Sequence, residues 1–178
     1  MSLKLLPLLL AVVLAIAVAG CGGSNSDQQA NAAYANSVCT AVGNWSTQVK
    51  SIATNFSTGI SKSSLQKKLT QFETATNKLV SQVKAVPPPN TSEGQDAKKQ
   101  VNQLATQVQS TTAAVKTAAN QLPPNATLPQ IVSALSGLAP QLTALESSAK
   151  STMSSLKQAK GSLASAFSHA DACKNLGG

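Results

Sequence analysis

Arginine is absent from this chain of 178 residues, and several other residue types are scarce. The chain has one histidine, six acidic residues and 3% aromatic residues. An arginine side chain can grip a phosphate or carboxylate with two parallel bonds, so its absence argues against a protein that binds nucleic acid. The basic residues, all lysine, leave a formal net charge of +8. That charge suits an anionic cell-wall polymer or lipid headgroups, or a solvated face with no partner.

The shortage of histidine and acids also limits the chemistry that the chain can perform. A catalytic nucleophile needs a base beside it, and His169, near Asp171 at the chain's end, is the sole histidine. The acidic residues are scattered along the chain. Glu93 and Asp96 are three residues apart, but they lie at a predicted helix start, where acidic side chains are stabilising in any case. His169 and Cys173 are four residues apart and could share a helix face, but a third and fourth metal ligand are hard to find. We therefore expect no enzyme, no cofactor and no metal.

The N-terminus has the order of a secretory signal peptide. Lys4 precedes an apolar run, Leu5–Val18, which is shorter than the roughly 20 residues needed to span a bilayer. The small pair Ala19-Gly20 then leads into Cys21. A positive start, a short apolar run and small residues at its end are typical of a segment that directs export.

The residues Val18-Ala19-Gly20-Cys21 resemble the lipobox of bacterial lipoproteins. The resemblance implies cleavage before Cys21, lipid on Cys21, and a location on the extracytoplasmic face of the cell membrane. An ordinary cleaved signal peptide or an uncleaved anchor would be the alternatives. The small and polar residues 22–29 favour a flexible tether. We expect a signal peptide over 1–20, the acylated cysteine and tether over 21–30, and one domain over 31–178.

Two cysteines remain once Cys21 is assigned to lipid. Cys39 and Cys173 form an even pair in an exported domain, which predicts a disulfide. The bond would close a loop of more than a hundred residues.

Apolar residues recur at three- and four-residue spacing along most of residues 31–172, which predicts packed helices. We expect helices over residues 31–60, 63–86, 92–122 and 140–172, with a short apolar segment over 127–138. Gly59 and the proline runs at 87–89 and 123–124 would end the first three helices. Pro140 would lie in the first turn of the last helix.

Four long helices with short turns predict an all-α, up-down-up-down four-helix bundle. In this topology the start of the first helix and the end of the fourth lie at one end. Cys39 and Cys173 could therefore meet there, close to the tether.

Tyr34, Cys39, Trp45 and Cys173 make the domain similar to small helical lipoproteins of actinobacteria. That resemblance carries no activity to transfer. We expect a lipid-anchored, non-catalytic bundle that acts by surface interaction in the cell envelope. The membrane is its partner through Cys21, with an envelope protein or an anionic wall polymer as possible further partners. The alternative is a module that captures a small hydrophobic or anionic molecule for a transporter or sensor.

Overall fold

The computed structural model describes residues 23–54, 61–174 and 176. These residues form five α-helices and one 3-10 turn, joined by short connections. The helices are α1 (Gly23–Thr54), α2 (Lys62–Ala85), α3 (Ser92–Asn120), α4 (Leu128–Gln158) and α5 (Ser162–His169), followed by η1 (Asp171–Cys173). These residues contain no β-strand, so the all-α prediction is confirmed. The predicted signal peptide over 1–20, Cys21, and Gly59 lie outside the described residues.

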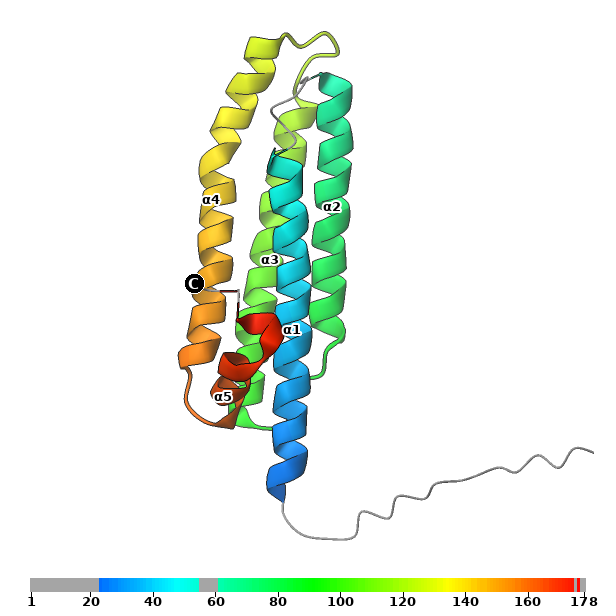
Figure 1. Cartoon of the computed structure of the whole chain (residues 1–178). Coiled ribbons are helices and arrows are strands. Elements are labelled where there is room, and N and C mark those ends of the chain that lie inside the picture. The colour runs from blue at the N-terminus through cyan, green and yellow to red at the C-terminus, as the bar shows by residue number, and fades with distance from the viewer. Residues whose placement is uncertain (1–22, 55–60, 175, 177–178) are drawn as a thin grey trace, which may run out of the picture.

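The four long helices run in alternating directions (Figure 1). α2 packs against α1 and α3, and α4 packs against α3. α1 and α4 make little direct contact, because α5 packs against both of them and η1 packs against α1. In a plain four-helix bundle the first and last helices pack directly against each other. Here the C-terminal segment α5–η1 replaces part of that contact between α1 and α4.

The predicted apolar seams face the centre of the bundle. The main core draws on every element and includes Val38, Trp45, Phe72, Val108 and Phe167, each at most 5% exposed. A smaller cluster lies at the end of the bundle far from the start of α1. It contains Leu65, Ala119, Leu122 and Ile131, which come from α2, α3, the α3–α4 connection and α4.

The buried side of α3 does not keep a strict heptad pattern. A strict pattern would bury Thr111, but Thr112 is the buried residue and Thr111 is only half-buried. An α-helix has 3.6 residues per turn, so its buried face drifts by about 20° in each heptad. Over the length of α3 this drift shifts the seam by one residue.

The expected tether is helical from its third residue onward. α1 begins at Gly23, eight residues before the predicted start, and residues 25–30 are exposed helix. This N-terminal end projects beyond the other helices (Figure 1). Residues 27–30, Asp-Gln-Gln-Ala, are compatible with helix, and Asn31 and Tyr34 in the following turn are buried. The burial of Asn31 and Tyr34 therefore stabilises helix in the residues that precede them, because packing outweighs the weak helix propensity of those residues.

The predicted division at Pro140 is wrong. α4 runs through Pro140 without interruption, although a proline inside a helix costs about 3 kcal/mol. Pro140 is exposed, while Ile131 before it and Leu145 after it are 1% and 2% exposed. Burial on both sides therefore holds one continuous helix in place.

The real break comes later, at residues 159–161. The apolar spacing predicts one helix to residue 172, but α4 ends at Gln158 and α5 begins at Ser162. Gly161 separates them with a φ of +93°, a conformation that side chains with a Cβ rarely adopt. The chain turns back here, which brings α5 against α1.

Hydroxyl residues cap the starts of α2 and α3. The N-cap of α2 is Ser61, whose side chain accepts a bond from the Ser64 N–H, so α2 begins one residue before the predicted start at 63. Thr91 caps α3, which begins at the predicted residue 92. Neighbouring hydroxyl residues offered several equivalent caps, and only the backbone geometry selects one of them.

A matched pair of glycine substitutions tests the break. Gly161→Ala should lower the free energy of unfolding by about 1–2 kcal/mol, because alanine is strained at positive φ. Gly137→Ala lies inside α4, where an added Cβ meets open space, and should raise it by up to about 1 kcal/mol. Urea denaturation measures both. Changes of the same sign would contradict the assigned turn.

Candidate functional site

The chain's single histidine is exposed and bonded within its own helix. His169 Nδ1 lies 2.8 Å from the backbone oxygen of Ser165 and 3.3 Å from the Ser165 hydroxyl. Asp171 forms an ion pair with Lys174, whose hydrogen bond and positive charge lower the pKa of the Asp171 carboxyl. Across residues 23–54, 61–174 and 176, no three His, Cys, Asp or Glu residues lie close enough to hold a metal ion.

Cys39 and Cys173 form the predicted disulfide, with a Cα–Cα distance of 5.1 Å. Both sulfurs belong to residues that are at most 1% exposed. The position differs from the expected one, because Cys39 lies near the middle of α1. It is 16 residues, or about 24 Å along the helix axis, from Gly23. The bond therefore joins the middle of α1 to the returning C-terminal segment, and does not lie at the end of the bundle where α1 begins.

Tyr34 also joins α1 to the C-terminal segment. Its ring meets the Phe167 ring edge-on at 6.1 Å, and one turn earlier Asn31 Nδ2 donates to the Ser162 hydroxyl at 2.8 Å. The Tyr34 hydroxyl is buried and has no hydrogen-bond partner among the described residues. Burial raises the pKa of Tyr34 to about 12. Tyr34 is thus a packing residue, and its phenol stays protonated at neutral pH.

Trp45 of α1 is buried in the core. Its indole N–H donates to the Thr76 hydroxyl at 3.4 Å, and Thr76 contacts the Thr112 hydroxyl at 3.0 Å. Thr112 in turn donates to the Val108 backbone oxygen at 2.8 Å. This buried chain of hydroxyls links α1, α2 and α3 and satisfies the Trp45 indole N–H and the hydroxyls of Thr76 and Thr112.

The cavity beside Trp45 is small. It has a volume of about 50 Å³ and is lined by Val42, Met153 and Leu176, among other residues. Pockets that enclose a small-molecule ligand have volumes of roughly 300–1,000 Å³. The core therefore leaves too little space for a buried ligand of that size.

Three lysines bond to backbone carbonyls at chain turns. Lys98 Nζ lies 2.7, 3.0 and 2.8 Å from the oxygens of Val83, Lys84 and Val86, where α2 ends. Lys62 donates to the Leu122 oxygen at the end of α3, and Lys157 donates to the Leu176 oxygen. The last carbonyls of a helix have no partner within it, so a cation there is stabilising. Partial burial lowers the pKa of Lys98.

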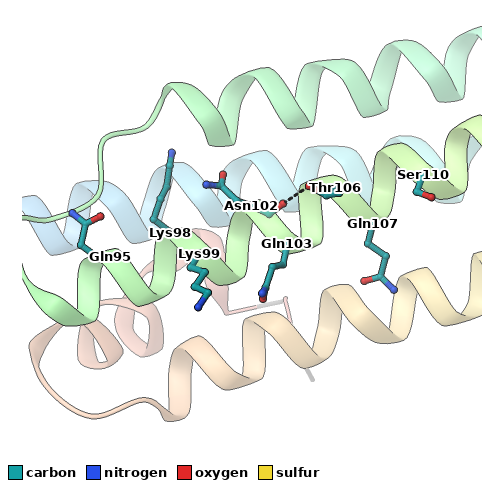
Figure 2. Close-up of a pocket in the computed structure, with 8 residues that line it drawn as sticks. All are labelled: Gln95, Lys98, Lys99, Asn102, Gln103, Thr106, Gln107 and Ser110. Atoms are coloured by element: carbon teal, nitrogen blue, oxygen red, sulfur yellow. Dashed lines mark hydrogen bonds between the residues drawn. The ribbon is translucent and has the colours of Figure 1, made fainter.

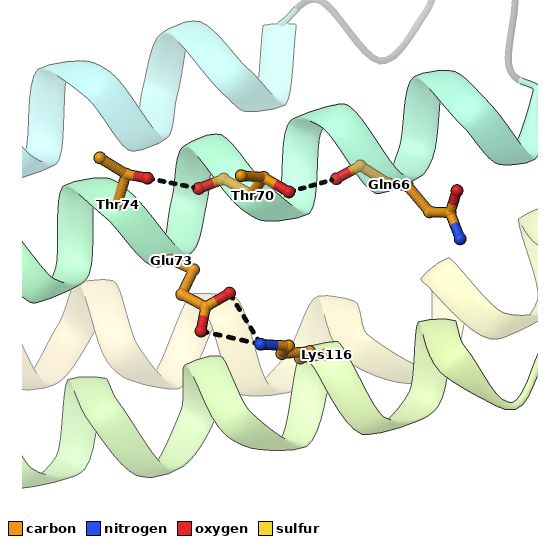
Figure 3. Close-up of polar contacts among 5 residues, drawn as sticks. All are labelled: Gln66, Thr70, Glu73, Thr74 and Lys116. Carbon is orange, nitrogen blue, oxygen red and sulfur yellow. Dashed lines mark hydrogen bonds and ion pairs between the residues drawn. The ribbon is translucent and has the colours of Figure 1, made fainter.

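The exposed helix faces are dominated by amides and hydroxyls. Figure 3 shows Thr70 and Thr74 on α2, which donate to backbone oxygens four residues earlier, and Glu73, which pairs with Lys116 of α3 at 2.9 Å. An open hollow of about 690 Å³ runs along α3. Figure 2 shows the side chains that line it, from Gln95 to Ser110. All of its lining residues come from one helix, so it is a strip of surface and encloses nothing.

One apolar surface stands apart from these polar faces. Leu128, Val132 and Leu142 of α4 are 56%, 46% and 37% exposed, and we call them the α4 stripe. The apolar spacing of residues 140–172 predicts that Leu142 is on the buried side of the last helix, and for this residue the prediction is wrong. The physical reason is that the far cluster around Ile131 contains no described residue of α1, so α4 has no neighbour there to cover its second apolar face.

Two signals in the sequence could have revealed the α4 stripe. The segment carries more apolar residues than one seam can bury, since Ile131 and Leu145 already form the buried side. In addition, residues 117–145 contain no charged residue at all, which is unusual for a solvated helix.

No described helix is long and apolar enough to cross a membrane. Comparison of the chain with family models, with curated proteins and with solved structures gave no match.

Substitution of two neighbouring lysines tests the carbonyl caps. Lys98→Met should lower the free energy of unfolding by about 1–2 kcal/mol, because the last carbonyls of α2 lose their donor. Lys99→Met removes the same charge from an exposed position and should change it by less than about 0.5 kcal/mol. Chemical denaturation at neutral pH measures the difference. Equal effects of the two substitutions would show that the loss is one of charge and not of the cap.

Proposed function

We propose that this chain is a lipid-anchored, extracytoplasmic bundle that acts without catalysis, by contact of its surface with another macromolecule of the cell envelope. The α4 stripe is the observation that carries the contact: a charge-free segment with three large aliphatic side chains open to solvent. Scattered exposed apolar residues are normal, but several on one helix face mark an interaction surface.

The anchor follows from the N-terminal sequence. The lipobox-like residues Val18-Ala19-Gly20-Cys21 end two residues before α1 begins. Lipid on Cys21 would therefore hold the start of α1 close to the membrane. The first turns of α4 are at the other end of the bundle (Figure 1). α1 alone is about 48 Å long, so the α4 stripe would face away from the membrane that holds the anchor.

The disulfide supports an oxidising location. Disulfides persist in exported proteins and are rare in the cytosol. A buried Cys39–Cys173 bond that holds the last helix in place is therefore consistent with export.

The two rival kinds of contact have less support. A captured small molecule would need more space than the cavity of about 50 Å³ beside Trp45. An anionic polymer would find fewer lysines than the net charge suggests, because Lys62, Lys98 and Lys157 are bonded to backbone carbonyls, and Lys116 and Lys150 are paired with acids. Exposed lysines such as Lys67 and Lys78 on α2 are the surface that such a polymer would use.

Metabolic labelling with a fatty-acid analogue tests the anchor. The full chain, expressed in a bacterium that processes lipoproteins, should carry the label and stay with the membrane fraction. Cys21→Ala should lose the label and leave the membrane, whereas the neighbouring Ser24→Ala should retain both properties. Intact mass spectrometry locates the lipid. A mature protein without lipid on Cys21 would overturn the anchored form of the proposal.

A further inference from the structure

We propose that the groove between α1 and α2 binds an anionic glycan, that is, a linear sugar polymer with repeated negative charges. This groove is separate from the α4 stripe, so the inference adds a second contact to the proposed function. It rests on the proposed anchor at one step only, the distance between the groove and the membrane.

The groove is open and polar. It has a volume of about 360 Å³ and lies between two helices that pack against each other. Amides and hydroxyls dominate its lining, which consists of Gln48, Ser51, Ile52, Thr70, Gln71 and Thr74. The hydroxyls of Thr70 and Thr74 donate to backbone oxygens of α2 (Figure 3), so their own oxygens are left to accept, while the Gln71 amide can donate. Such a lining matches the hydroxyl groups of a sugar chain.

Two exposed lysines of α2 flank this lining. Lys67 is four residues before Gln71, and Lys78 is four residues after Thr74. At 100° per residue these four positions fall within an arc of about 60° on one side of α2. The two lysines are 11 residues, or about 17 Å, apart along the helix axis. One small anion cannot reach both of them, whereas a chain with repeated charges can.

The charge around the groove has one sign. Residues 28–92 contain six lysines and a single acidic residue, Glu73. Glu73 lies about 120° around α2 from Lys67 and pairs with Lys116 of α3 (Figure 3), so it does not neutralise the lysines of the groove. Neither Lys67 nor Lys78 forms an ion pair with a described residue. Both charges are therefore available to a polyanion.

The position of the groove argues against the lipid headgroups of the anchoring membrane as its occupant. Gln48 is 25 residues, or about 38 Å, along α1 from Gly23. Exposed charges attract each other over only about 8–10 Å at physiological salt. In a bundle that stands on a lipid at Cys21, the groove is thus several such lengths from the headgroups, and an extended polymer can still reach it.

Binding of the full chain in detergent to soluble, fluorescently labelled polygalacturonate tests the inference. The chain should bind this polymer at low salt and release it as the salt concentration rises, and it should not bind neutral dextran. Lys67→Gln combined with Lys78→Gln should weaken binding at least about tenfold, because both charges beside the groove are lost. Fluorescence anisotropy measures the affinity. Absence of binding at low salt, or equal binding of dextran, would overturn the inference.

A matched pair of substitutions removes the same charge elsewhere. Lys99 near the start of α3 and Lys160 after α4 are also exposed. Lys99→Gln combined with Lys160→Gln should change the affinity less than about twofold, because distant exposed charges are screened. Equal loss in the two pairs would show an effect of net charge and would overturn the groove as the binding surface.

A second comparison tests the polar lining. Gln71→Ala should weaken binding of polygalacturonate and leave binding of polyphosphate, which has no hydroxyl groups, unchanged. Gln66→Ala is about 140° around α2 from Gln71 and should affect neither polymer. Equal effects of Gln71→Ala on the two polymers, or no effect on either, would show that the chain recognises charge alone and would overturn the glycan as the occupant.

The outcomes are separable from those of the anchor test. Lipid on Cys21 with no polymer binding would refute the glycan contact alone. Polymer binding that requires Lys67 and Lys78 in a chain without lipid would refute the anchor alone. Binding to phosphatidylglycerol vesicles in place of polygalacturonate, with the same loss in the Lys67→Gln/Lys78→Gln variant, would make a membrane the occupant and overturn the inference.

Discussion

The attachment of the C-terminal segment to α1 is the interaction on which the rest of the structure depends. The Cys39–Cys173 bond, the Tyr34–Phe167 ring contact and the Asn31–Ser162 hydrogen bond all connect α1 with the segment after Gly161. α1 and α4 have little contact of their own, and α5 packs against both. Without this attachment α1 would be secured to the bundle mainly through α2.

The same arrangement explains why the N-terminal half of α4 leaves one apolar side exposed. The returning segment covers the C-terminal half of α4, and its last described residue, Leu176, lies by the cavity that Trp45 and Met153 line. Beyond that point Ile131 is buried among described residues of α2, α3 and the α3–α4 connection, which leave the α4 stripe exposed. The disulfide and the candidate interaction surface are thus two consequences of how the chain fills the side of the bundle between α1 and α4.

The sequence was sufficient to predict the features that depend on a repeated spacing or on a pair of cysteines. Three- and four-residue spacing identified the buried sides of α2 and α3, and an even pair of cysteines identified the disulfide. It was insufficient where a local signal competes with packing. Pro140 marked a helix start that burial of Ile131 and Leu145 overrides, and the polar residues 27–30 are helical because Asn31 and Tyr34 are buried next to them.

The turn at Gly161 and the α4 stripe were harder to predict for a different reason. Gly161 can adopt a positive φ, as any glycine can, but only the contact of α5 with α1 requires that conformation here. Similarly, the stripe has the same spacing as a buried seam, and its exposure depends on where α1 and the returning segment lie. Tertiary packing decides both features, although the charge-free segment 117–145 is a sequence signal for the second.

Hydrogen exchange of the Cys39→Ala/Cys173→Ala variant against the oxidised protein tests the central claim most directly. The bond closes a loop of 134 residues, and its removal should lower the free energy of unfolding by about 5 kcal/mol. We predict that amides of α5 lose their protection first and most strongly, while those of α2 and α3 remain the slowest to exchange. Protection of α5 equal to that in the oxidised protein would contradict the claim that the disulfide holds the C-terminal segment against α1.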